Sequence, residues 1–168
     1  YVYFGINDFI AIPDELEKIC KVFEKEEAGS SEKLLDFIKM AKDNYKIAVT
    51  DMLYKMPGLS PLELISTDTA KRVGYFFTNI KNLVHKRFKN PKLRSILEFP
   101  VLFLGAESSN TPAFYNFMNY ADFGLGTWQP TNGFYDVVKA MISIGNSLGV
   151  KYYNNSNVTK IITEKSNT

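Results

Sequence analysis

Apolar residues recur at spacings of three and four along most of this chain, a pattern typical of amphipathic helices. Short punctuation signals separate the periodic stretches, including Gly-Ser pairs, Pro-Gly and Asn-Pro steps. A further pair of helix starts is indicated at Ser60 and Ser66. The helices that this pattern predicts begin after an N-cap at Asp14 and cover residues 32–54, 69–89, 91–104 (kinked at Pro100), 112–120 and 134–148.

Short β-branched and aromatic runs between turn residues predict a smaller number of strands. The first two, at 1–6 and 9–12, flank Asn7-Asp8 and are expected to form a hairpin. Others are expected near Thr127, at 150–153 and at 158–163. The prediction is therefore an α+β fold in one domain over 1–168. It has about six or seven helices around a small mixed or antiparallel sheet made of all five strands.

The composition excludes several kinds of functional site. The chain has one cysteine, one histidine and a net charge of +2. A disulfide framework is excluded, a reducing compartment is favoured, and no His/Cys cluster has metal-ligand spacing, so no metal is expected. Cys20 lies on an apolar helix face, where a small core residue is expected rather than a nucleophile. Aromatic residues make up 14% of the chain, which indicates a large core, an apolar ligand, or both.

Basic residues gather in one segment. Eight Lys or Arg and no Asp or Glu lie between Lys71 and Arg94. This segment is either an ordinary solvated face or a surface that attracts anionic lipid headgroups. Nucleic acid is not expected, because Phe76 and Phe77 are assigned to the buried side of the predicted helix and could not stack on bases. The candidate membrane-surface residues are Lys81, Lys86, Arg87 and Lys89.

Glycine, proline and the only tryptophan concentrate in residues 124–133. The stretch contains Trp128, Pro130, Asn132 and Gly133 and leads directly into the helix predicted at 134–148. Backbone N–H groups at that helix start could accept an anion or a flavin carbonyl, and glycine would let a flat ligand approach the backbone. The alternative is a plain strand-turn-helix connection with its tryptophan in the core.

Four motifs occur in this order: NPKLRSILEFPVLFLG at 90–105, PAFY at 112–115, GTWQPTNG at 126–133, and GVKY with VTKI at 149–152 and 158–161. Their order and spacing resemble the bacterial phytoene desaturase family of carotenoid enzymes. That resemblance implies FAD-dependent removal of hydrogen from a long apolar polyene by a cytoplasmic, peripheral membrane enzyme. It also implies a substrate-binding domain inserted between two halves of an FAD-binding domain, and this chain resembles that insert.

The resemblance assigns roles to particular residues. Arg94 becomes the candidate catalytic residue, and Tyr115 and Met118 the candidate lining of the polyene channel. The FAD of the full-length protein would lie against Trp128, Pro130, Asn132 and Gly133. The chain contains no G-x-G-x-x-G after a strand and opens at Tyr1 without Met. It is therefore expected to belong to a longer flavoprotein and to hold no FAD and show no activity by itself.

Two positions depart from the family pattern. Asn132-Gly133 stands where the family usually has Gly-Gly, and Asn90-Pro91-Lys92 stands where an acidic residue often precedes the arginine. Asparagine tolerates left-handed backbone, so the turn is expected to survive. The missing acidic residue argues against an acid–base pair built around Arg94. The alternative function is a non-catalytic module that binds lipid or a partner through an aromatic cavity and a basic surface.

Overall fold

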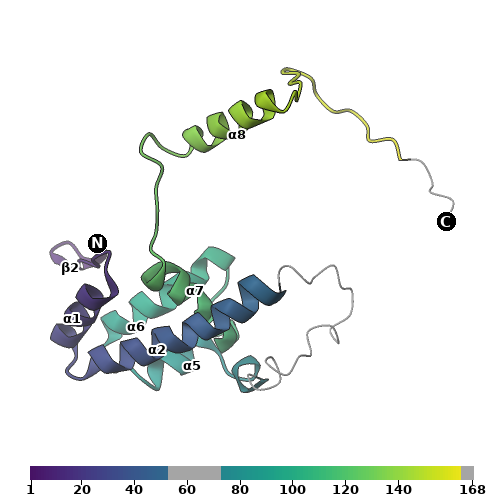
Figure 1. Cartoon of the computed structure of the whole chain (residues 1–168). Helices are drawn as coiled ribbons and strands as arrows, with labels where there is room; N and C mark the ends of the chain where they lie inside the picture. The colour runs from purple at the N-terminus through teal and green to yellow at the C-terminus, as the bar shows by residue number, and fades with distance from the viewer. Residues whose placement is uncertain (53–72, 164–168) are drawn as a thin grey trace. The chain divides into compact units, whose positions relative to one another are not determined.

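The computed structural model describes residues 1–52 and 73–163. It divides the chain into two compact units, Tyr1–Thr127 and Trp128–Thr168 (Figure 1). The helix starts predicted at Ser60 and Ser66 lie outside the described residues, as does the beginning of the helix predicted at 69–89. The prediction of one domain over 1–168 stays a prediction.

The chain begins with a two-stranded antiparallel hairpin. Strand β1, Val2–Gly5, pairs with β2, Asp8–Ile10, in a register that places Tyr3 opposite Phe9. The rings of Tyr3 and Phe9 lie 5.5 Å apart on one face, while Ile10 is buried on the other. This alternation is what a strand with one buried face requires, and the predicted hairpin is confirmed.

The larger predicted sheet is wrong. Within the described residues, the segments near Thr127, at 150–153 and at 158–163 form no strand, and the sheet contains only β1 and β2. A strand needs a neighbour for its N–H and C=O groups. The N–H of Val150 donates instead to the carbonyl of Gly145 at 2.9 Å, which closes the end of a helix. The fold is therefore mostly helical with a small antiparallel sheet.

Helices α1, Leu16–Glu26, and α2, Ser30–Tyr45, form a hairpin around Gly29, whose φ is +74°. Asp14 is not the N-cap of α1. Glu15 occupies that position without a side-chain capping bond, and its carboxylate accepts from Lys18 instead. Beyond Tyr45 the chain continues as a π-helix, Lys46–Met52, so the helix predicted at 32–54 is confirmed over its described part.

The helix predicted at 69–89 is interrupted. The structure has a 3₁₀ turn η3, Val73–Phe76, and a short helix α5, Ile80–His85. Between them the chain pairs with a distant segment: the N–H of Ala113 donates to the carbonyl of Thr78 at 2.7 Å, and Ile80 and Thr111 make a second such bond. These non-local bonds replace the helical ones that apolar periodicity alone predicts.

Helix α6, Pro91–Glu98, begins as predicted, with the Asn90 side chain accepting from the Lys92 N–H at 2.8 Å. At Pro100 it changes into a 3₁₀ helix, η4, Phe99–Leu104, because proline has no N–H for the α-helical bond. Three short turns follow, namely η5 Ala113–Asn116, α7 Phe117–Asn119 and the π-helix η6 Tyr120–Gly124. The second unit contains α8, Tyr135–Ser147.

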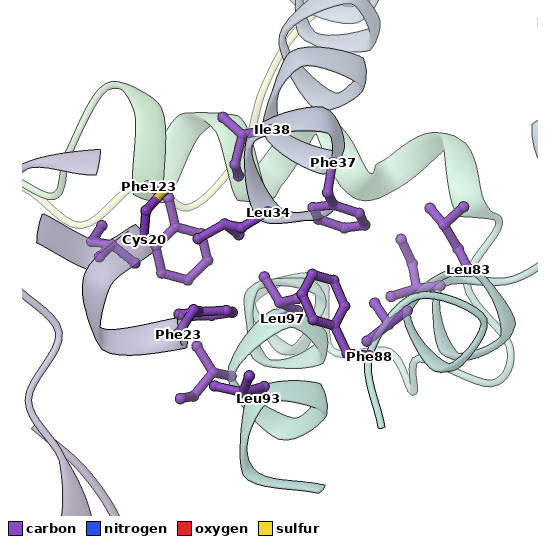
Figure 2. Close-up of a cluster of buried hydrophobic side chains, with 14 of the residues drawn as sticks. Cys20, Phe23, Leu34, Phe37, Ile38, Leu83, Phe88, Leu93, Leu97 and Phe123 are labelled. Carbon is purple, nitrogen blue, oxygen red and sulfur yellow. The ribbon is translucent and has the colours of Figure 1, made fainter. Parts of the chain in front are cut away.

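The core of the first unit lies between α1, α2, α5 and α6 (Figure 2). Phe88 stands at its centre, with its ring 6.0 Å from that of Phe23 and 6.3 Å from that of Phe37, both edge to face. Cys20 is also buried there, and burial raises the pKa of its thiol, which confirms a core role. Further members of the core are Ile19, Leu34, Ile80, Val84, Leu93, Leu97 and Val101.

Phe88→Ala is expected to lower the free energy of unfolding by about 3–5 kcal/mol, because it removes a fully buried ring and both edge-to-face contacts. Phe77, whose side chain is 87% exposed, provides the matched control. Phe77→Ala should change stability by less than about 0.5 kcal/mol. Denaturant unfolding of both variants checks this, and equal losses would contradict the assigned core.

Candidate functional site

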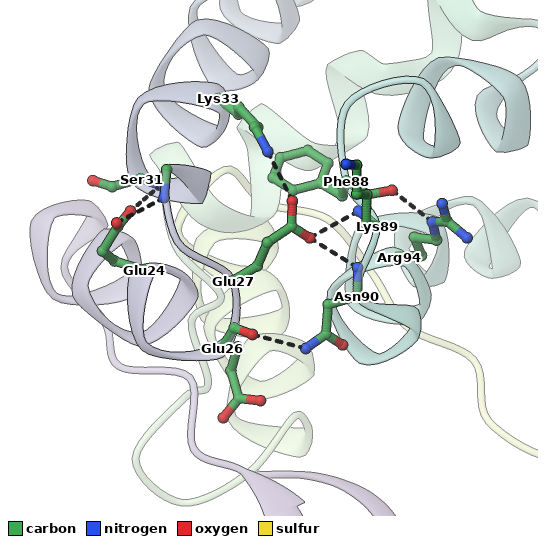
Figure 3. A network of polar contacts seen from close by, with 10 residues as sticks. Glu24, Glu26, Glu27, Ser31, Lys33, Phe88, Lys89, Asn90 and Arg94 are labelled. Atoms are coloured by element: carbon green, nitrogen blue, oxygen red, sulfur yellow. Dashed lines mark hydrogen bonds and ion pairs between the residues drawn. The ribbon is translucent and has the colours of Figure 1, made fainter.

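The start of α6, which carries Arg94, is held by a carboxylate from the α1–α2 turn (Figure 3). One oxygen of Glu27 accepts from the backbone N–H groups of Lys89 and Asn90, both at 2.8 Å. The other accepts from the Lys33 ammonium at 2.7 Å. Three donors from two distant parts of the chain therefore meet at one side chain.

The same junction sets the position of Arg94. Its Nε donates to the carbonyl of Phe88 at 2.6 Å, one residue before the backbone that Glu27 holds (Figure 3). Within the described residues no carboxylate pairs with Arg94, and its terminal nitrogens make no hydrogen bond. Arg94 is thus a half-buried, fixed cation with donors to spare. It can orient or attract an acceptor, whereas proton abstraction needs a base.

The surroundings of Glu27 strongly shift the pKa of its carboxyl group. Burial, the largest single influence, raises the pKa of this carboxyl. The hydrogen bonds from Lys33, Asn90 and Lys89 and the charge of Lys33 together outweigh burial and lower the pKa to about 2. The carboxylate is therefore ionised at neutral pH, and it stabilises the fold that places Arg94.

The predicted channel residues belong to an aromatic cluster. Tyr115 is half-buried against the core, with its ring 5.5 Å from Phe117 and 6.5 Å from Phe114. The Phe114 ring in turn stacks on Phe76 at 4.9 Å. Met118, in the next turn, is half-buried. Tyr115 and Met118 thus lie in the same aromatic-rich segment, 113–119, which also contains the buried Asn116 and Asn119.

Sequence reasoning missed an exposed apolar ridge formed by η4 beside α7. The apolar ridge comprises Phe99, Leu102, Phe103 and Leu104, which are between 47% and 73% exposed. The rings of Phe99 and Phe103 meet edge to face at 5.6 Å. Continuous α-helical periodicity over 91–104 would place Leu104 on the same face as the buried Leu97, but the change to three residues per turn alters the phase and Leu104 is exposed. The signal in the sequence was the uninterrupted apolar run of Phe99–Leu104.

The four candidate membrane-surface residues are not equivalent. Lys81, Lys86 and Lys89 are exposed, whereas the half-buried Arg87 donates to the carbonyl of Leu83 at 3.2 Å. Arg87 also contacts the Met40 sulfur at 3.8 Å.

The two phenylalanines of the basic segment do not lie on the buried side of a helix, contrary to the expectation that counted against nucleic acid. Phe76 and Phe77 are 43% and 87% exposed, because the predicted helix is broken before α5. The basic segment therefore contains two exposed aromatic side chains.

In the second unit, residues 130–133 of the glycine-rich stretch form a turn, called here the glycine-rich turn, that enters α8. Gly133 has φ +90° and its N–H donates to the Pro130 carbonyl at 2.9 Å. No heavy atom lies within 4 Å of where a Cβ on Gly133 would stand. Trp128 is 85% exposed, and the Asn132 amide donates to Asp136 at 2.8 Å. A flat ligand could therefore reach the backbone at Gly133 without steric hindrance.

This turn fits the carbonyl edge of a flavin better than it fits a full negative charge. Among the described residues, the backbone N–H groups of Phe134 and Tyr135 donate no hydrogen bond, so both are available to an acceptor. Asp136, however, places a carboxylate in the first turn of α8 and already interacts favourably with its positive end. A second anion there would be repelled.

A second polar cluster, also missed from the sequence, joins α5 to the end of α6. Glu98 accepts from Ser108 with one oxygen, and its other oxygen lies 2.8 Å from Nε2 of His85. Since the carboxylate stands between them, the serine donates to Glu98 rather than to the imidazole. The arrangement therefore lacks a nucleophile–base pair. It instead stabilises the end of α6, directly before the first residue of the apolar ridge.

The described residues contain no group of three or more His, Cys, Asp or Glu side chains that could hold a metal. In the same part of the chain, no helix has the length and apolar character needed to span a bilayer.

Comparison with known proteins tests the family resemblance. The chain is 28% identical to carotenoid 3,4-desaturase of Haloarcula japonica over 166 residues, which cover 98% of this chain and 34% of that protein. It is 24% identical to the 4,4'-diapophytoene desaturase of Staphylococcus haemolyticus, covering 96% of the chain and 32% of the relative. The zeta-carotene-forming phytoene desaturase of Myxococcus xanthus is 22% identical, with 97% and 32% covered.

The curated homologues of this chain are carotenoid and phytoene desaturases. The resemblance expected from the motifs is thereby confirmed, and it extends over nearly the whole chain, including the segment before Asn90 where no motif had been found. The chain spans about a third of the length of these desaturases. No protein-family model matches the chain.

Glu27→Gln is expected to lower the free energy of unfolding by about 3 kcal/mol at pH 7, following from a pKa reduced from 4.5 to about 2. A carboxyl group whose pKa is lower in the folded state stabilises the fold at any pH above its pKa in the unfolded state. This stabilisation is lost as the pH falls through the pKa of the folded state. The difference from wild type should therefore shrink between about pH 5 and pH 2.

Glu32→Gln provides the control for this prediction, because Glu32 is exposed and makes no hydrogen bond with the described residues. Denaturant unfolding across this pH range measures both variants. A Glu27→Gln deficit that stayed constant with pH would contradict the assignment of an ionised, hydrogen-bonded Glu27.

Proposed function

We propose that this chain is the polyene-binding part of an FAD-dependent carotenoid desaturase-like oxidoreductase. The observation that carries the proposal is similarity to proteins named carotenoid or phytoene desaturases along almost the entire chain. The exposed apolar side chains of the apolar ridge support it, because the ridge lies next to the segment holding Tyr115 and Met118.

A polyene has no polar group with which to be recognised, so its binding depends on burying apolar surface. Phe99 and Phe103 supply paired aromatic faces, and Leu102 extends them. Exposed apolar residues clustered in one turn commonly mark a ligand or protein contact. In this proposal the apolar ridge and Met118 form one wall of the polyene site, and the rest of the flavoprotein forms the other.

The flavin supplies the redox chemistry when it is bound. The residues of this chain hold and orient the flavin. Gly133 leaves space for its ring, while the N–H groups of Phe134 and Tyr135 can donate to a ring carbonyl. Trp128, Pro130 and Asn132 form the rest of that contact. Arg94 acts as a fixed cation that orients an acceptor, since the described residues give it no acidic partner.

Association with a membrane surface belongs to the same proposal, since polyenes dissolve in bilayers. The exposed lysines of the basic segment and the exposed Phe77 favour it, because cations and aromatic side chains are the usual pair at a bilayer interface. The same observation favours the second candidate, a non-catalytic lipid- or partner-binding module. The two differ in whether the full-length protein binds FAD and converts a polyene.

Gly133→Val in the full-length protein is expected to abolish flavin retention or turnover, because a β-branched side chain would occupy the space beside the backbone. Gly149→Val is the matched control. Gly149 also has a left-handed φ, of +79°, and no atom within 4 Å of its Cβ position, so backbone strain is similar. Flavin absorbance and phytoene conversion measure both, and equal losses would assign the effect to strain rather than to a flavin contact.

Phe103→Asp should reduce kcat/KM for an apolar polyene by about tenfold or more, because a charge on the apolar ridge would have to be desolvated against hydrocarbon. Leu35, an exposed apolar residue on α2, provides the control, and Leu35→Asp should leave kcat/KM within about twofold. Steady-state assays with detergent-dispersed substrate measure both. Unchanged turnover in Phe103→Asp would remove the apolar ridge from the polyene site.

A further inference from the structure

An open cleft of about 560 Å³ lies between η3 and α5 in the first unit. Lys86 and Arg87 line it, together with the polar side chains of Tyr75, Thr78 and Asn82. Among the residues that the structure describes, no acidic side chain lines the cleft. This cleft, called here the basic cleft, has neither Arg94 nor any residue of the apolar ridge or the glycine-rich turn among its lining residues.

The donors of the basic cleft are available to a ligand. Within the described residues, Lys86 makes no hydrogen bond or ion pair, and the same holds for the side chains of Tyr75, Thr78 and Asn82. Arg87 uses one terminal nitrogen on the Leu83 carbonyl and the other on a methionine sulfur, which fixes its guanidinium without neutralising it. Two cations are thus accompanied by three neutral side chains that can donate.

Such a set of donors suits a phosphate group. A carboxylate is planar and has two oxygens, whereas a phosphate presents more acceptor oxygens in a tetrahedral arrangement and attracts both lysine and arginine. Basic pockets of this kind bind lipid headgroups at membrane surfaces. The cleft volume also falls in the range of small-ligand sites.

The surroundings of the basic cleft indicate an amphiphilic ligand. Thr78 lines the cleft, and the residue before it, Phe77, is 87% exposed. Phe76 is also partly exposed and stacks on Phe114. An apolar aromatic side chain beside a cationic cleft matches a molecule with a charged head and a hydrocarbon tail.

We propose that the basic cleft binds the phosphate group of an anionic membrane lipid, with Phe77 inserted among the acyl chains. This inference rests on the membrane association in the proposed function and makes it specific. Of the four candidate membrane-surface residues, only Lys86 and Arg87 hold the headgroup, while Lys81 and Lys89 contribute diffuse charge.

The test compares Lys86→Ala with Lys81→Ala in the full-length protein. Both lysines are exposed, both lack a partner among the described residues, and each change removes one positive charge. With phosphatidylcholine vesicles containing phosphatidic acid, Lys86→Ala should weaken binding by about tenfold and Lys81→Ala by no more than about twofold. Equal losses would assign binding to diffuse charge and overturn the proposal.

A second measurement separates phosphate recognition from charge. Vesicles made equally negative with a fatty acid present carboxylates in place of phosphates. Wild type should bind the phosphatidic acid vesicles more tightly, and Lys86→Ala should lose that preference. A wild-type protein that binds both kinds of vesicle equally would overturn the phosphate assignment.

Soluble competitors distinguish a lipid headgroup from free phosphate. At constant ionic strength, dihexanoyl phosphatidic acid should displace the protein from vesicles, whereas inorganic phosphate at the same concentration should not. Equal displacement by inorganic phosphate would assign the cleft to a free anion and overturn the lipid inference. Retained polyene conversion in detergent with no phosphate preference would leave the proposed function intact and remove only this inference.

Discussion

The hydrogen bonds of Glu27 join the first helical hairpin to the segment that carries Arg94. A largely buried carboxylate is costly unless donors surround it, and three donors do so here, with the side chain only 13% exposed. Two of them are backbone N–H groups at the start of α6, so the carboxylate fixes main-chain position rather than a mobile side chain. Phe88, immediately before these groups, is thereby held at the centre of the core.

This arrangement explains why a short helix can present functional groups in a defined place. Helix α6 extends only over Pro91–Glu98, too short to be stable by itself. Glu27 and Asn90 hold its beginning, and the contacts of Glu98 with His85 and Ser108 hold its end. The apolar ridge can therefore remain exposed without becoming disordered, because the residues on either side of it are fixed.

Local signals in the sequence predicted local structure well. The N-terminal hairpin, the Asn90-Pro91 helix start and the helix predicted at 134–148 are confirmed, since each depends on neighbouring residues. The hairpin turns at Ile6-Asn7 rather than at Asn7-Asp8, because Asp8 already pairs with Gly5 as the first residue of β2. Predictions that depended on distant partners were wrong. The pairing of Thr78 with Ala113 breaks a stretch with good helical periodicity, and the strands expected near Lys151 and Val158 have no partner strand among the described residues.

The candidate site likewise has features that the sequence could predict and features that it could not. Residue types and order were sufficient to indicate a desaturase-like chain, because motifs preserve spacing. They could not indicate the apolar ridge, because its exposure follows from the change of helix type at Pro100. Nor could they distinguish Lys86 from Lys81, which share a segment and a charge but differ in whether they line the basic cleft.

The elements that carry the basic cleft and the apolar ridge are connected by one side-chain contact. Lys86 follows His85, and Phe99 follows Glu98, while the His85 and Glu98 side chains lie 2.8 Å apart. A substrate that dissolves in lipid must leave the bilayer and enter an apolar site without crossing water, where its transfer is strongly unfavourable. In the proposed function, this connection keeps the residues that attach to the membrane at a constant distance from those that contact the polyene. Attachment would then orient the apolar ridge as well as concentrate the protein at the membrane surface.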